Sequence, residues 1–343
     1  MSGRTTISVV AAEAGVSIST VSLVMNGKGP VAEETRERVR EAADRLGYTP
    51  SRSARGLAGG RTGNIGFVLR EDHFRRSESF YTRIFLGVEF EARRRENYVL
   101  LATIPVAYDP ERDAPRFLRD RSVDGVVIAG VVEHTFLERL AALDLPFVLA
   151  DYAWGDAPAV EIDNEGGAAA VARHFLDRGH TRVAYLGADP DHPSPAARCA
   201  GFVRAMRDAG HAPADSHVVV GPGALDRRTG ADLAGQLLDL PAAERPTAVF
   251  CANDSVALGL IDGARERGLS VPQDLAVAGF DDVEAAAFSH PPLTTVRVFK
   301  EHLGEVALRL LADRMAGPTE AARFDRGASV TRISTELVVR GST

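Results

Sequence analysis

From residue 64 onward the sequence alternates short apolar runs with amphipathic stretches that have the period of a helix. The apolar runs form two series of predicted strands, at 65–69, 98–103, 125–129 and 147–150, then at 183–186, 218–220, 248–251 and 275–278. Helices are predicted near 81–95, 110–120, 133–143, 165–178, 196–209, 227–239 and 254–267. Such alternation predicts an α/β fold with two doubly wound parallel sheets in two lobes, and a ligand at the carboxyl ends of the strands.

The first 48 residues follow another pattern, that of three short helices joined by turns. One helix ends at Gly15, Ser17 can cap a second over 18–25, and a third spans about 33–46. The spacing of Ala11, Gly15 and Val21 is typical of a helix-turn-helix, whose second helix reads DNA. A small helical hairpin without DNA binding has the same spacing and stays open as an alternative.

The segment between these two parts, residues 50–60, is predicted to be a helix too weak to form alone. Pro50 can begin a helix and Gly59 can end one, but about eight residues with Gly56 among them cannot hold a helix in water. We expect this segment to be coil when free and helical when DNA holds it.

Charge is distributed unevenly along the chain. The net charge is −7, yet residues 1–61 contain nine Lys and Arg and six Asp and Glu, which gives +3 and leaves −10 for the rest. A polyanion would therefore bind at the cationic end. Because the sequence has no long apolar run and no secretory leader, we expect a cytoplasmic protein with no membrane partner. Cys199 and Cys251 lack metal-site spacing, and neither a metal nor a cofactor is expected.

Several strings of residues point to one family. Residues 6–27 read TISVVAAEAGVSISTVSLVMNG, followed by ETRERV at 34–39 and LGYTP at 46–50. They closely resemble the lactose-repressor (LacI/GalR) family of bacterial transcription regulators. Further matches lie at 124–128, 162–164, 178–180, 186–187, 198–202, 250–254, 277–282 and 292–296. The resemblance covers nearly the whole chain and implies a body like that of periplasmic sugar-binding proteins.

The resemblance implies that the helix over 18–25 enters the major groove of a pseudo-palindromic double-stranded operator. It also implies that Leu57 wedges between base steps in the minor groove, although a Leu packed on the body is an alternative. Two positions depart from the family, since Leu23 replaces a frequent Arg and Ala32 a frequent capping Ser. The implied DNA-binding residues are Thr6, Ser17, Ile18, Ser19, Thr20, Ser22, Leu23, Asn26, Tyr48, Arg52, Arg55 and Leu57.

The same resemblance implies a small-molecule effector between the lobes, with a sugar as the first candidate. The implied effector-binding residues are Phe80, Tyr81, Asp151, Trp154, Asp163, Arg198, Leu225, Asn253 and Asp281. Other roles stay open: Arg198 could form an interlobe ion pair, Asp163 and Asp281 could cap helices, and Trp154 could close the hinge. The loop at 70–79 departs from the family's Asn-Pro-Phe-Phe pattern, and Leu225 stands where relatives often have an aromatic residue.

Together these inferences predict a domain plan and a function. We expect a helix-turn-helix domain at 1–48, a hinge at 49–62, a first lobe from 63–162 and 293–323, and a second lobe from 163–292 and 324–343 whose last strand spans 333–339. We expect a homodimeric, sequence-specific transcriptional repressor whose operator affinity depends on the effector. The alternatives are a solute-binding protein and a sugar-modifying enzyme, but the sequence contains no HExxH, GxSxG or GxxxxGK motif.

Overall fold

The computed structural model describes residues 5–25, 27, 29–48, 61–74, 80–189, 192–214, 217–316 and 330–343. The chain divides into two compact units, Met1–Gly63 and Asn64–Thr343. Asn26 and most of the predicted hinge, including Arg52, Arg55 and Leu57, lie outside the described residues. Within the described ranges, no single helix is long and apolar enough to cross a membrane. The helices α1 (Ile7–Ala14) and α2 (Ile18–Met25) pass that test only as a pair, and a bend of 102° separates them.

The N-terminal unit is a bundle of three helices, α1 (Ile7–Ala14), α2 (Ile18–Met25) and α3 (Glu33–Arg45). Val10, Val21 and Val39, one from each helix, are buried in a common core. Gly15 ends α1 in the left-handed conformation, at φ 62°, where a residue without a Cβ is favoured. The Ser17 hydroxyl accepts a hydrogen bond of 3.1 Å from the backbone N–H of Thr20, which is the predicted cap.

The first lobe of the larger unit contains a six-stranded parallel sheet with the strand order β11-β5-β4-β3-β1-β2. Its strands are β1 (Asn64–Arg70), β2 (Tyr98–Ile104), β3 (Gly125–Ala129), β4 (Phe147–Ala150), β5 (Ala159–Ile162) and β11 (Val330–Ile333). The short 3-10 helix η1 (Glu71–His73) follows β1, and the α-helices are α5 (Phe80–Arg94), α6 (Arg116–Arg119), α7 (His134–Ala142) and α13 (Lys300–Met315).

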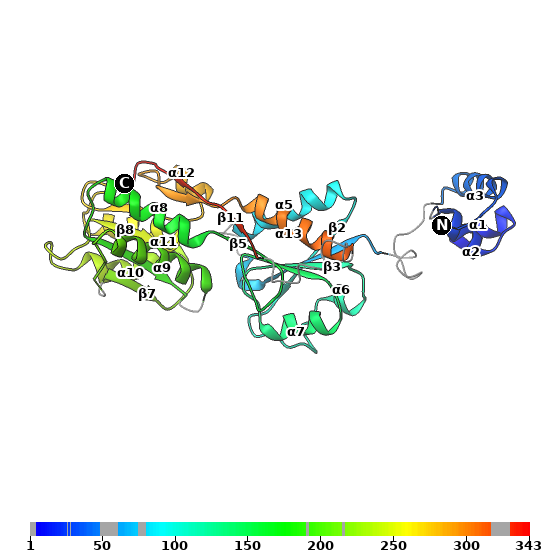
Figure 1. Ribbon diagram of the computed structural model, residues 1–343, viewed down its shortest axis with the longest axis horizontal. Helices are drawn as coiled ribbons and strands as arrows, with labels where there is room; N and C mark the ends of the chain where they lie inside the picture. The colour runs from blue at the N-terminus through cyan, green and yellow to red at the C-terminus, as the bar shows by residue number, and fades with distance from the viewer. Residues whose placement is uncertain are drawn as a thin grey trace. The chain divides into compact units, whose positions relative to one another are not determined.

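Alternating side chains of the strands bury both faces of this sheet. Phe67 of β1 packs in one cluster with Ile84 of α5 and Leu303 of α13. Its neighbour Val68 points the other way and packs with Phe117 of α6 and Phe136 of α7. The helices consequently form two layers with the sheet between them, as Figure 1 shows.

The second lobe has the same architecture around a four-stranded parallel sheet with the order β7-β6-β8-β9. Its elements are β6 (Val183–Ala188), β7 (Val218–Gly221), β8 (Ala248–Cys251), β9 (Ala276–Ala278), α8 (Asn164–Asp177), α9 (Pro193–Asp208), α10 (Arg227–Leu238), α11 (Asp254–Glu266) and α12 (Glu284–Phe288). Tyr185 packs with Phe202 on the α8 and α9 side, and Leu186 packs with Leu237 on the α10 and α11 side. The predicted fold of two parallel doubly wound sheets is confirmed.

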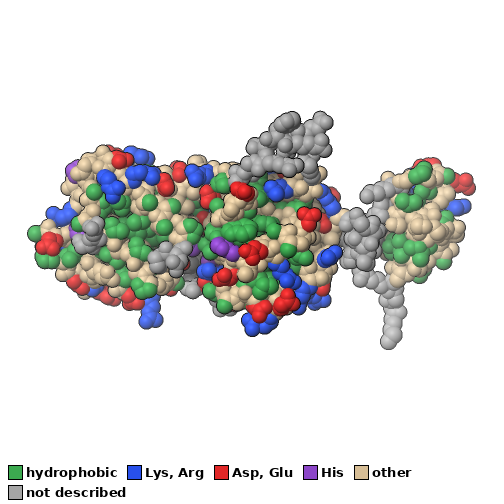
Figure 2. Space-filling model, turned by 60° about the horizontal axis from the view of Figure 1, so that its bottom comes forward, with side chains coloured by type: hydrophobic (Ala, Val, Ile, Leu, Met, Phe, Trp, Pro, Cys, Tyr) green, Lys and Arg blue, Asp and Glu red, His purple; other side chains and the backbone are tan. Residues whose placement is uncertain are grey.

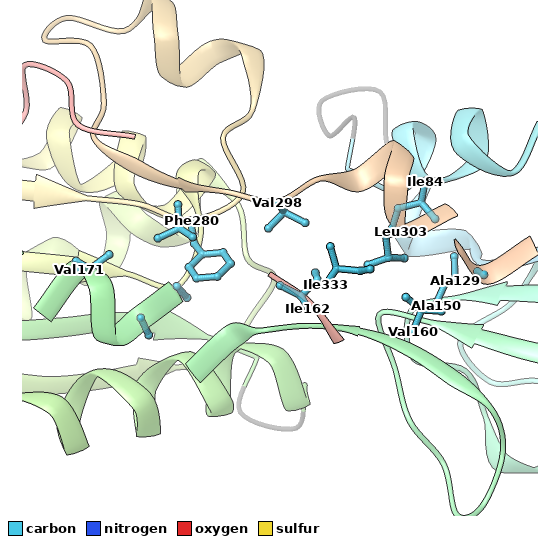
Figure 3. Close-up of a cluster of buried hydrophobic side chains, with 14 of the residues drawn as sticks. Ile84, Ala129, Ala150, Val160, Ile162, Val171, Phe280, Val298, Leu303 and Ile333 are labelled. Atoms are coloured by element: carbon cyan, nitrogen blue, oxygen red, sulfur yellow. The ribbon is translucent and has the colours of Figure 1, made fainter. Parts of the chain in front are cut away.

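Within the described residues, the chain crosses between the lobes three times. The first crossing leads from β5 to α8, and the second leads from β10 (Thr295–Arg297) to α13. The third leads from β11 to β12 (Glu336–Val338), which pairs antiparallel with β10 beside the second lobe. Ile162, Val298 and Ile333, one from each crossing, join a single buried cluster that contains side chains of both lobes (Figure 3).

Two details differ from the sequence predictions at the C-terminal end. The predicted single strand at 333–339 is wrong, because β11 pairs with β5 of the first lobe and only β12 reaches the second lobe's side. The predicted lobe boundary at 324 is wrong for the same reason, since residues 330–333 belong to the first sheet. The boundary at 293 shifts to the stretch after Arg297, because β10 is bridged to Asp281 of the second lobe.

The predicted helix at 110–120 is also shorter than expected. The Asp109 carboxylate accepts a hydrogen bond of 2.9 Å from the backbone N–H of Glu111, which forms a turn there. Pro115 then precedes the short helix α6 and supplies no backbone N–H. Helical hydrogen bonding therefore begins only after Pro115.

Candidate effector site and DNA-binding unit

A cavity of about 110 Å³, here called the interlobe cavity, lies between the two lobes of the larger unit. Its polar lining follows the ends of parallel strands: Arg70 ends β1, Asp151 follows β4 and Asp189 follows β6. Asn253 follows β8, and Asp281 comes soon after β9. Parallel strands from both lobes thus direct their carboxyl ends at one place, where α/β proteins bind ligands.

Asp151 is the buried carboxylate of the first lobe at this cavity. It has φ 62°, and its two carboxylate oxygens accept hydrogen bonds from Tyr81 Oη at 3.2 Å and Ser194 Oγ at 3.4 Å. Burial raises the pKa of Asp151 to about 7, although Arg198 opposes the rise. Since Tyr81 belongs to α5 and Ser194 to α9, this carboxylate joins the two lobes through hydrogen bonds.

Arg198 and Asp281 form the ion pair at the second lobe's wall of the cavity. Nη2 of Arg198 lies 3.1 Å from Oδ1 of Asp281, and burial raises the pKa of Asp281 while Arg198 opposes that rise. The same guanidinium donates to Asn164 Oδ1 at 2.8 Å and to the Ala252 carbonyl at 2.7 Å. It also lies 3.8 Å from the centre of the Phe280 ring. The alternative of an interlobe ion pair for Arg198 is therefore wrong, because both members of the pair belong to the second lobe.

Asn253 positions another part of the cavity wall. Its Oδ1 accepts from the backbone N–H of Val256 at 2.8 Å and so caps α11. Its Nδ2 donates to the carbonyl of Leu225 at 2.9 Å, which holds the Leu225 loop at the cavity. Phe80, at the first residue of α5, also lines the cavity.

Two of the implied effector residues lie elsewhere. Trp154 does not line the interlobe cavity; it packs against the first lobe's α6 and α7 cluster, with its ring 5.9 Å from that of His134. Asp163 caps α8 by accepting from the backbone N–H of Gly166 at 3.0 Å. It lines a second cavity of about 200 Å³, which shares Asp151 with the first.

The structure also brings to the cavity residues that the sequence analysis did not single out. Nε and Nη2 of Arg70 donate to the two carboxylate oxygens of Asp72 at 2.7 and 2.8 Å. His73 stacks on the ring of Tyr81, with centroids 4.7 Å apart and planes 14° apart. Burial lowers the pKa of His192 to about 3, so this imidazole is neutral at ordinary pH. The sequence does contain a signal for these residues, because they lie at or after the carboxyl ends of β1 and β6, where open α/β sheets bind their ligands.

The N-terminal unit exposes five of the eight implied DNA-binding residues that the structure describes. Thr6, Ser17, Ile18, Ser19 and Leu23 are exposed, whereas Thr20, Ser22 and Tyr48 are half-buried. Tyr48 packs against the three-helix core, and Ser17 is occupied in part as the cap of α2. Ala32 precedes α3 and provides no side-chain cap, because a methyl group cannot accept a hydrogen bond from the backbone.

Comparisons with known proteins agree with this architecture. Residues 6–51 match the family described as "Bacterial regulatory proteins, lacI family", and residues 172–343 match "Periplasmic binding protein-like domain". The transcriptional repressor PurR of Vibrio atlanticus is 34% identical over 316 residues, which cover 90% of this chain and 92% of that protein. The chain belongs to the LacI family.

Other relatives share nearly the full length of this LacI-family regulator. Catabolite control protein A of Priestia megaterium is 34% identical over 314 residues, 90% of this chain and 92% of the relative. The lac repressor dimer bound to operator and the anti-inducer ONPF has a TM-score of 0.80 at 26% identity, with 99% of both chains covered. The regulator CelR in complex with cellobiose has a TM-score of 0.73 at 31% identity, with 99% and 100% covered. The LacI-family chain is thus a DNA-binding transcriptional regulator with an effector-binding body, and its relatives are regulators rather than enzymes.

Proposed function

We propose that this regulator is a cytoplasmic, homodimeric repressor without enzymatic activity, and that a neutral sugar in the interlobe cavity controls its affinity for a pseudo-palindromic operator. The observation that carries the proposal is that two buried carboxylates, Asp151 and Asp281, line one cavity, where the Arg198 guanidinium pairs with Asp281. Carboxylates accept hydrogen bonds from sugar hydroxyl groups, and the guanidinium donates to sugar oxygens. A relative of known structure is complexed with the sugar cellobiose, which supports this class of ligand.

The size of the cavity adds a condition to the proposal. Ligand sites usually occupy about 300 Å³ or more, whereas the interlobe cavity has about 110 Å³ and the neighbouring cavity about 200 Å³. Both cavities are lined by Asp151 and Ser194. A sugar therefore requires a wider separation of the lobes or the joining of the two cavities, and either change alters the angle between the lobes.

A thermal-shift screen with sugars, nucleosides and related metabolites tests the effector class, because a ligand that binds only the folded state raises the unfolding temperature. We expect a sugar to stabilise the chain and Asp281→Asn to reduce that shift. Asp226→Asn is the matched control, since Asp226 caps α10 and lines neither cavity. Stabilisation by nucleosides alone would contradict the sugar.

Dimerisation is supported by apolar side chains exposed on the first lobe. Phe90 on α5 and Tyr98 on the edge strand β2 are exposed, and Leu86 and Leu101 lie on the same two elements. Figure 2 shows hydrophobic side chains exposed on both lobes. We expect Phe90→Asp to convert the dimer into a monomer in sedimentation experiments. Leu143→Asp is the control, because Leu143 is similarly exposed but follows α7 on the opposite side of the sheet.

DNA binding by the first 61 residues has its own test. We expect removal of residues 1–61 to abolish operator binding while sugar binding persists. Leu57, which lies outside the described residues, is proposed as the minor-groove wedge. Leu57→Ala should then weaken operator binding and leave sugar binding intact. Unchanged operator binding by the shortened chain would overturn the proposal.

A further inference from the structure

The outer face of α2 has an unusual chemical composition for a helix that reads DNA. Val21 and Val24 are buried in the bundle core, which turns the opposite side of the helix outward. Ile18, Ser19 and Leu23 are on the outward side, and Ile18 and Leu23 are 51% and 40% exposed. The eight residues ISTVSLVM contain no acidic, basic or amide side chain. The outward side of the helix therefore presents only alkyl and hydroxyl groups.

This composition excludes the strongest kinds of base contact. Guanine is read by a bidentate Arg or Lys, adenine by a bidentate Asn or Gln, and cytosine by Asp or Glu. A hydroxyl group makes single hydrogen bonds to several bases and discriminates poorly among them. The group that alkyl side chains recognise in the major groove is the 5-methyl group of thymine.

The surroundings of α2 hold these groups in place. The Ser17 hydroxyl caps the helix and lies 2.7 Å from the Ser19 hydroxyl and 2.9 Å from that of Thr20. The side chain of Leu23 rests over Gly29, where an added Cβ would lie 3.3 Å from its Cδ2 atom. The alkyl group of Leu23 is thus supported from one side and exposed on the other.

We propose that α2 reads its operator mainly through thymine methyl groups, contacted by Ile18 and Leu23. This inference rests on the proposed function, in which α2 enters the major groove. Each half-site then contains thymines opposite these two side chains, and Ser19 adds hydrogen bonds that tolerate more than one base.

The test begins with selection of binding sites from random duplexes by the full-length chain. In the selected site each thymine is replaced in turn by deoxyuracil, which lacks the 5-methyl group and keeps every hydrogen-bonding atom. We expect a loss of about fourfold in affinity for each contacted methyl group, and about fifteenfold when the equivalent thymine is replaced in both half-sites. A selected site in which no thymine is sensitive to this replacement would overturn the proposal.

Protein variants show whether the loss arises from these side chains or from altered DNA shape. Ile18→Ala and Leu23→Ala should each bind the thymine and uracil forms of one position equally well. Val9→Ala is the matched control, because Val9 is similarly exposed but belongs to α1. The Val9→Ala variant should still bind the thymine form of the site more tightly than the uracil form. A preference for thymine that survives in both α2 variants would contradict the assignment to Ile18 and Leu23. Failure to select any sequence would instead contradict the proposed function itself, and the methyl contacts with it.

Discussion

The guanidinium of Arg198 and the carboxylate of Asp281 lie 3.1 Å apart, with side chains only 4% and 10% exposed. Removal of one member of a buried ion pair leaves the other charge without compensation, which commonly costs about 3–5 kcal/mol. A loss of that size is a large part of the stability of an ordinary domain.

We therefore expect Arg198→Met to lower the free energy of unfolding by about 3 kcal/mol or more. The double variant with Asp281→Asn should lose less than the two single losses combined, because neither charge remains. Urea unfolding followed by the fluorescence of Trp154, the single Trp, measures both. The control is Arg204→Met on the same helix, whose pair with Glu165 is exposed and screened by water, so its loss should be much smaller. Equal losses in Arg198→Met and Arg204→Met would contradict the expectation.

Stability should fall as pH rises across neutrality. Burial raises the pKa of Asp151 to about 7 and that of Asp254 to about 8, whereas an unfolded Asp titrates near pH 4. Between the unfolded and the folded pKa, the folded state keeps a proton that the unfolded state has lost. Each group's stabilising effect is therefore complete below about pH 4 and is lost as pH rises through its folded pKa. Each group contributes at most about 1.4 kcal/mol per pH unit. Urea unfolding at pH 5 to 8.5 measures the slope, which Asp151→Asn and Asp254→Asn should each reduce; an unchanged slope in both would contradict the raised pKa values.

Lys300 should influence ligand binding although its charge lies behind the cavity wall. Its buried ammonium donates to the carbonyl of Asp281 and lies 5.8 Å from the centre of the Phe80 ring. Both of these residues line the interlobe cavity. We expect Lys300→Met to reduce the thermal shift given by the sugar from the screen, because Asp281 and Phe80 lose a common anchor. Arg83→Met, which removes an exposed ion pair with Glu301, is the control and should leave the shift unchanged.

Close packing of α5 against α13 makes Gly87 sensitive to substitution. A Cβ at Gly87 would lie 1.9 Å from the carbonyl oxygen of Glu301, so Gly87→Ala must push the helices apart. We expect a loss of about 1–3 kcal/mol in the free energy of unfolding, the usual cost of overpacking. Arg93→Ala, on the exposed side of α5, should change stability by less than about 0.5 kcal/mol. Urea unfolding of both variants checks this, and a neutral Gly87→Ala would show that the helices can separate without cost.

The sequence predicted the parallel sheets because buried strands read as continuous apolar runs. It predicted a ligand at the carboxyl ends of parallel strands, and the structure brings Asp151, Asn253 and Asp281, which the resemblance implied, to one cavity there. It missed the division between β11 and β12, because no Gly, Pro, Asn or Asp stands between Ile333 and Glu336 to mark the end of a strand. It named Trp154 as an effector candidate with hinge closure as the alternative, and the structure packs the ring in the first lobe's α6 and α7 cluster, which composition alone could not show.

The three crossings between the lobes limit how a ligand can move them. Three chain segments that share one buried cluster cannot swivel independently, so the lobes should rotate about a single common axis. Every ligand that moves the lobes then changes the same angle between them. An inducer and a corepressor would then change this one angle in opposite directions.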